Sequence, residues 1–185
     1  MKIEVAFSSI SAQPDLVAVV NSANANLRLG SGVAGAIHRA AGPELEAYCQ
    51  PYAPLALGKA LLTPAFQLPN QWVIHVRVGH YLNHAEPIAI LEKGLREVFA
   101  LAEHHEIRSL GLPAIGTGMF KFPPMLAARA TARVLKQIDQ ATQVIELVRL
   151  CVASEHMAKL YMSALQQTES ELDPASDHQF HEDEL

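Results

Sequence analysis

The spacing of hydrophobic residues along the chain predicts strands that alternate with helices. Residues 2–8 alternate between polar and apolar positions, as in a strand with one buried face, and residues 16–20 form a continuous apolar run, as in a strand buried on both faces. Residues 88–102 carry apolar side chains at helical spacing. By the same criteria we expect further strands at 59–64, 71–78, 107–112 and 144–152, and helices at 33–41, 44–48, 124–138 and 154–166.

This order of elements predicts one α/β domain. Strands that alternate with helices form a mixed, mostly parallel sheet that is covered by helices on both faces. In open sheets of this kind, ligands bind beyond the carboxyl ends of the strands. The loops that follow the strands are therefore the expected place for a site.

Two loops that lead from a strand to a helix are rich in small residues. The first contains Gly30, Ser31, Gly32, Val33 and Ala34, and the second contains Ile115, Gly116, Thr117, Gly118, Met119 and Phe120. Without bulky side chains, backbone N–H groups at a helix start can point at a phosphate, and the helix dipole favours negative charge there. Either loop alone is equally consistent with a plain turn, but the two together favour a diphosphate ligand.

Two common nucleotide-binding motifs do not fit these loops. The pattern GxxxxGK[ST] of P-loop ATPases does not occur, and the GxGxxG spacing of residues 30–35 does not directly follow the first strand, as it does in a Rossmann strand-helix-strand unit. Walker ATPases and Rossmann dehydrogenases are therefore poor candidates.

Acidic residues are concentrated at the C-terminus. Residues 168–185 contain seven acidic residues and no Lys or Arg, so we expect a folded domain at 1–167 and an acidic, disordered tail at 168–185. Without this tail the chain carries 14 basic and 12 acidic residues, a net charge of about +2. That balance suits a small phosphate-bearing ligand better than a nucleic acid.

The remaining composition indicates a cytoplasmic protein without a metal or cofactor. No apolar run is long enough to cross a membrane, and the first residues do not form a signal peptide. Cys49 and Cys151 stand alone in apolar surroundings, as expected of buried thiols in a reducing compartment. The nine histidines are scattered outside any metal-binding motif. We expect a monomer.

Several segments together resemble the macrodomain family. They are Val19-Val20-Asn21-Ser22-Ala23-Asn24, the stretch from Gly30 to Pro43, the two middle strands, and Pro113-Ala114-Ile115-Gly116-Thr117-Gly118. The resemblance covers roughly residues 1–165, and it implies a three-layer αβα sandwich with ADP-ribose lying across the carboxyl edge of the sheet.

The resemblance also implies roles for individual residues. The diphosphate would lie between the two loops, with residues 30–34 around the phosphate and ribose and residues 115–120 closing over the other side. Asn24 would bind the distal ribose through a hydrogen bond, and Phe120 would pack on that sugar. Asn21 and His75 are expected to serve the structure, as satisfied buried polar groups.

Ala34 departs from the family branch that hydrolyses ADP-ribose from acidic side chains. An aspartate that helps to activate water occupies this place in that branch. A methyl group cannot accept a proton, and loss of a general base typically costs about 10² to 10⁴ in rate. If the protein is catalytic, Asn24 is the candidate residue and turnover is slow.

The adenine end of the expected site departs from the family as well. Ser9, followed by Ile10, is the nearest match to an aspartate that reads the adenine amino group, and the usual stacking aromatic is missing from Leu150 to Ser154. Tyr48 or Tyr81 could supply the aromatic contact instead. A weaker adenine contact or a different nucleotide remain alternatives.

Three functions follow from these observations. The first is a binding module for free or protein-linked ADP-ribose. The second is a slow hydrolase of mono-ADP-ribosylated protein or of O-acetyl-ADP-ribose. The third is a degenerate macrodomain that has lost its ligand and acts through protein contacts.

Overall fold

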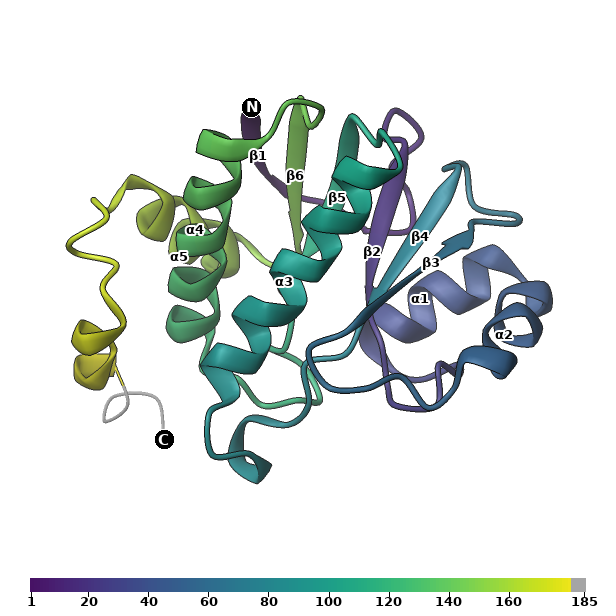
Figure 1. The fold of residues 1–185 in the computed structure, drawn as a ribbon, viewed down its shortest axis with the longest axis horizontal. Coiled ribbons are helices and arrows are strands. Elements are labelled where there is room, and N and C mark those ends of the chain that lie inside the picture. The colour runs from purple at the N-terminus through teal and green to yellow at the C-terminus, as the bar shows by residue number, and fades with distance from the viewer. Residues whose placement is uncertain (181–185) are drawn as a thin grey trace.

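The computed structural model describes residues 1–180 and has a six-stranded sheet at its centre (Figure 1). The strand order is β1-β6-β5-β2-β4-β3, and all neighbouring pairs are parallel except β3 and β4. The strands are β1 (Lys2–Phe7), β2 (Ala18–Ser22), β3 (Ala60–Pro64), β4 (Trp72–Val76), β5 (Ser109–Pro113) and β6 (Leu147–Val152).

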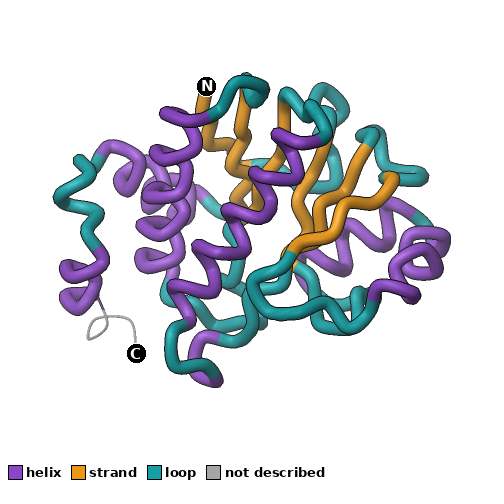
Figure 2. The backbone as a smooth tube through the Cα atoms, viewed as in Figure 1, coloured by secondary structure: helices purple, strands orange, loops and turns teal. Residues whose placement is uncertain are grey.

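Helices cover both faces of the sheet, so the predicted three-layer αβα sandwich is confirmed (Figure 2). One layer holds α1 and α2, and the other holds α3, α4 and α5. The helices are α1 (Gly32–Ala41), α2 (Pro43–Cys49), α3 (Pro87–His104), α4 (Pro124–Ala141) and α5 (Glu155–Gln166), with short 3-10 helices η1 (Gln50–Tyr52), η2 (Tyr81–Asn83) and η3 (Pro174–Phe180). None of the helices within residues 1–180 is long and apolar enough to span a membrane.

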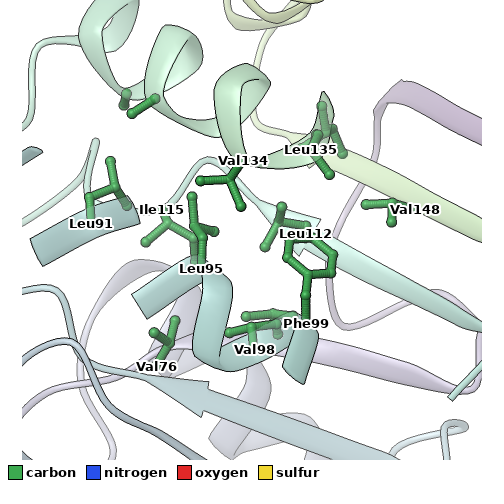
Figure 3. Close-up of a cluster of buried hydrophobic side chains, with 14 of the residues drawn as sticks. Val76, Leu91, Leu95, Val98, Phe99, Leu112, Ile115, Val134, Leu135 and Val148 are labelled. Atoms are coloured by element: carbon green, nitrogen blue, oxygen red, sulfur yellow. The ribbon is translucent and has the colours of Figure 1, made fainter. Parts of the chain in front are cut away.

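The larger hydrophobic core lies between the sheet and the layer of α3, α4 and α5. Figure 3 shows its centre, where Leu95 and Phe99 of α3 and Val134 of α4 face Leu112 of β5. A smaller core on the other face holds α1 and α2 against the sheet. Both faces of the central strands are thus buried, which agrees with their continuous apolar runs.

The topology places the two small-residue loops beside each other. The first loop follows β2 and the second follows β5, and these strands are parallel neighbours that pair Ala18 with Leu110. Their carboxyl ends therefore open at the same edge of the sheet.

Strand β2 begins two residues later than the sequence predicts. The side chain of Asn70 donates to the carbonyl oxygens of Gln13 and Leu16, at 2.7 Å each. Because a side chain occupies the Leu16 carbonyl, pairing with β4 and β5 starts only at Ala18. The strand then continues to Ser22, so Asn21 lies inside the sheet.

The expectation of a disordered tail does not hold for residues 168–177. Leu172 is buried against the larger core, and Asp177 is buried with its carboxylate bound to Arg129 and Arg133 of α4. Two buried guanidinium groups require a partner, and this acid supplies it. Residues 181–185 lie outside the described residues.

Candidate functional site

A cavity of about 1000 Å³ opens at the carboxyl edge of the sheet, between the two small-residue loops. The structure brings all but one of the predicted site residues to this cavity. Those that line it are Ser9, Ile10, Asn24, Gly30, Ser31, Gly32, Val33, Ala34, Gly116, Thr117, Gly118, Met119 and Phe120.

Ile115 is the exception. Its side chain is completely buried in the larger core, where it lies near Leu95 (Figure 3), and its N–H donates to the Pro113 carbonyl at 2.8 Å. Ile115 comes two residues after the end of β5, and its side chain packs in the core beneath α3 and α4. It anchors the second loop to the larger core and does not line the cavity.

The first loop turns back against the start of α1. A Cβ atom at Gly35 would overlap the carbonyl oxygen of Gly30, so only glycine allows the loop to pass this close to the helix. Ser31 is the N-cap, but its hydroxyl makes no capping hydrogen bond. The first N–H groups of α1 have no partner within the helix and therefore remain available to an anion.

The second loop is a tight turn that depends on Gly116. This residue has φ +86°, and a Cβ atom there would lie 2.6 Å from Cδ2 of Phe122. The N–H of Phe122 donates to the Gly116 carbonyl at 3.0 Å, which closes the turn. Among the described residues, the N–H groups of Gly118 and Met119 have no backbone acceptor, so they too are available to a ligand.

Asn24 lines the cavity, and its side-chain amide makes two hydrogen bonds to the backbone of Arg28. Its Nδ2 donates to the Arg28 carbonyl at 2.7 Å, and its Oδ1 accepts from the Arg28 N–H at 3.1 Å. An amide has two N–H donors and two acceptor lone pairs, so one of each is left for a ligand. These bonds also fix the orientation of the side chain.

A buried hydrogen-bonded chain supports the sheet beneath the first loop. Asn21 Nδ2 lies 3.0 Å from His75 Nδ1, and Thr63 Oγ1 lies 3.1 Å from His75 Nε2. Burial lowers the pKa of His75 to about 3, so the ring is neutral. His75 is thus a satisfied buried histidine, as predicted, whereas Asn21 is satisfied only at Nδ2 and its buried Oδ1 has no hydrogen-bond partner among the described residues.

The end of the cavity beside β1 contains an aromatic residue that the sequence reasoning missed. Phe7, the last residue of β1, lines the cavity and is 67% exposed. It pairs in register with Val152, the last residue of β6. Ile3, Val5 and Phe7 form one alternating apolar series in the sequence. Ile3 and Val5 pack against the core and Phe7 lies beyond it, so the length of this series is the feature that could have predicted an exposed aromatic here.

Neither tyrosine considered for the adenine contact lines this cavity. Tyr48 belongs to an exposed group on the α2 side of the molecule, with its ring centroid 5.9 Å from those of both Tyr52 and Phe66. Tyr81 is buried, with its ring 5.3 Å from that of Phe122. That part of the prediction is wrong because both rings are packed elsewhere.

The family model of the macro domain matches residues 20–131, which include the end of β2, both loops and the start of α4. This stretch is more than half of the chain. The chain belongs to the macrodomain family.

Relatives of this macrodomain are similar over most of its length. A protein of Salmonella typhimurium named O-acetyl-ADP-ribose deacetylase is 38% identical over 156 residues, which are 81% of this chain and 87% of the relative. The solved structure of the Oceanobacillus iheyensis macrodomain with ADP has a TM-score of 0.83 at 31% identity and covers 89% of this chain and 90% of its own. The Trypanosoma brucei macrodomain in complex with ADP-ribose has a TM-score of 0.78 at 29% identity, over 88% of this chain and 68% of its own.

The cavity of this macrodomain has an uncharged lining. Among the described residues that line it there is no Asp, Glu, His, Lys or Arg. Cys151 is the one thiol, and burial raises its pKa, so it stays neutral. An anion in this cavity would be held by backbone dipoles, and the lining provides no carboxylate or imidazole for general-base chemistry.

Proposed function

We propose that the protein binds ADP-ribose, free or attached to a protein, and does not hydrolyse it efficiently. The observation that carries this proposal is the pair of N–H-rich loops that face one cavity of about 1000 Å³. That volume is at the upper end of ordinary small-molecule sites, as a dinucleotide-sized ligand requires.

Each part of ADP-ribose has a matching part of the cavity. The diphosphate would lie between the α1 start and the Gly116 turn, where free N–H groups from both loops replace its water shell. The distal ribose would lie beside the remaining donor and acceptor of Asn24 and against Phe120. Arg28 and Leu29, next to Asn24, are exposed, which supports access for a ribose attached to a protein.

Ala34 supports binding over catalysis. It lines the cavity at the first turn of α1, where an acid would be required, and none of the other described lining residues can accept a proton at neutral pH. Slow hydrolysis is the second candidate, favoured by the similarity to the Salmonella deacetylase and by the position of Asn24. Such turnover would depend on a phosphate oxygen of the substrate itself as the base.

We further propose that the protein acts as a monomer in the cytoplasm and does not bind nucleic acid. Two buried free thiols, Cys49 and Cys151, support a reducing compartment. A near-neutral body without a basic stripe supports the exclusion of polyanions.

The test is calorimetric titration of ADP-ribose, ADP and AMP into the wild type, Asn24→Ala and Asn26→Ala. Asn26 is exposed in the same loop and does not line the cavity, so it is the matched control. We expect Asn24→Ala to weaken ADP-ribose binding about 10- to 100-fold, as the loss of a hydrogen-bonding partner does, and Asn26→Ala to leave it unchanged. No heat with any nucleotide would contradict the proposal and favour a macrodomain that has lost its ligand.

A further inference from the structure

The end of the cavity farthest from Asn24 along the sheet edge is lined mainly by apolar side chains. Phe7 exposes an aromatic ring there, and Ile10, Cys151 and Val152 add apolar surface. An aromatic ring that is 67% exposed on the wall of a cavity contributes little to the stability of the fold, because most of its surface is not buried in the core. It is well placed to stack on a flat ligand group.

The polar groups at this end are hydroxyls. Ser8 Oγ accepts from Gln13 Nε2 at 3.1 Å, and Ser9 Oγ lies 3.0 Å from Ser11 Oγ. A hydroxyl rotates and either donates or accepts, whereas a carboxylate only accepts. The polar groups at this end are therefore compatible with ligand donors and with ligand acceptors.

The two nearest carboxylates along the chain, Asp15 and Glu4, are both bound to Arg149 outside the cavity. Asp15 accepts two hydrogen bonds from Arg149, at 2.9 and 2.7 Å, and this pairing lowers its pKa. Arg149 also binds Glu4 at 2.8 Å. Neither acid is among the residues that line the cavity.

We propose that this end holds a purine base stacked on Phe7, and that it accepts a 6-oxo purine as readily as a 6-amino purine. A carboxylate would attract the amino group of adenine and repel the 6-oxo oxygen of hypoxanthine or guanine. The hydroxyls of Ser8 and Ser9 turn to suit either group, so stacking sets the affinity and the 6-substituent does not. This inference rests on the proposed binding of ADP-ribose, and it extends the ligand class to diphosphoribosides of purines in general.

The experiment compares ADP-ribose with inosine diphosphate ribose by calorimetric titration. For the wild type we expect dissociation constants within about threefold of each other, since a hydroxyl makes one hydrogen bond to either base. Phe7→Ala should weaken both ligands together, roughly 5- to 100-fold, the range for loss of one base–aromatic contact. Phe7→Tyr keeps the ring and should bind both as the wild type does, and Phe66→Ala removes an aromatic that is 39% exposed away from the cavity and should have no effect.

Ser9→Asp provides the converse test. A carboxylate at this position should weaken inosine diphosphate ribose at least about 10-fold more than ADP-ribose, because it has no donor for the 6-oxo group. A wild type that prefers ADP-ribose more than about 10-fold, or unchanged binding in Phe7→Ala, would overturn the inference while leaving the proposed function standing. Absence of binding for both ligands would overturn both.

Discussion

The carboxylate of Asp177 lies 2.7 Å from Nε of Arg129, a buried side chain in the middle of α4. The other carboxylate oxygen lies 3.0 Å from Arg133, which also binds Glu92 of α3 at 2.7 Å. The C-terminal segment thus closes an ion network between two helices. Removing one member of such a network leaves buried charge without compensation.

We therefore expect Asp177→Asn to destabilise the protein by about 3 kcal/mol, the usual cost of breaking a buried pair. Glu169→Gln, at an exposed position in the same segment, should change the stability by less than about 0.5 kcal/mol. Urea unfolding of both variants measures the difference. Equal stabilities would mean that the segment does not contribute to the folded domain.

Gly116 should tolerate no side chain. Gly116→Ala places a Cβ atom 2.6 Å from the Phe122 ring in a backbone conformation with φ +86°, so we expect a loss of about 1 to 3 kcal/mol in stability and weaker binding of ADP-ribose. Gly118→Ala is the control, since a Cβ atom there meets nothing within 4 Å. Thermal unfolding and titration of the two variants separate a specific requirement at Gly116 from a general need for glycine in the loop.

Ala34→Asp should add hydrolytic activity. The new carboxylate would face the cavity from the first turn of α1, where the helix dipole stabilises negative charge, and it could orient a water molecule. We expect release of ADP-ribose from mono-ADP-ribosylated protein to rise about 10²- to 10⁴-fold. Ala36→Asp is a suitable control, because this residue lines the cavity from the same helix two positions further on. A similar rise in both variants would argue against a specific role for position 34.

Acid should destabilise the protein through His75. Its pKa in the folded state is about 3, below its ordinary value of 6.5, because burial disfavours the charged ring and the nearby His38 adds to this effect. The unfolded chain binds the extra proton between these two values, so stability that is present above pH 6.5 is lost as the pH falls toward 3. At pH 5 the loss from this one group is about 2 kcal/mol.

His75→Gln measures this contribution. Glutamine keeps a donor and an acceptor for Thr63 and Asn21 but does not titrate. We expect the variant to be less stable than the wild type at pH 7.5 and to lose less stability between pH 7.5 and pH 5, as followed by urea unfolding. His38, which is also buried with its pKa lowered by burial, is present in both proteins. An equal loss in both proteins would contradict the assignment to His75.

The position of the site was predicted from the two small-residue loops and from the resemblance to macrodomains, which together placed Asn24 and Gly116 at one ligand. The strand order, which brings the residues after β2 and β5 to the same edge, comes from the structure. The chain beyond the loops was harder to predict. Phe7 belongs to an ordinary strand pattern, and its exposure depends on how far β6 extends beside it.

The C-terminal segment was mispredicted from its composition. Seven acidic residues indicated a solvated tail, but one of them, Asp177, pairs with two arginines some 45 residues earlier. The available signal was on the helix: Arg129 and Arg133 are spaced by four and share a face with the buried Leu126. Two arginines on an apolar helix face indicate that an acid elsewhere in the chain must reach them.

The uncharged lining of the cavity has a consequence for how the ligand arrives. Arginine and lysine sites attract phosphates from a distance, and salt screens that attraction. The field of a helix end falls off within about one turn, so it reaches a much shorter distance than a full charge. A diphosphate would therefore approach this cavity with little long-range guidance, and its rate of association would depend less on salt than at a site lined by arginine or lysine.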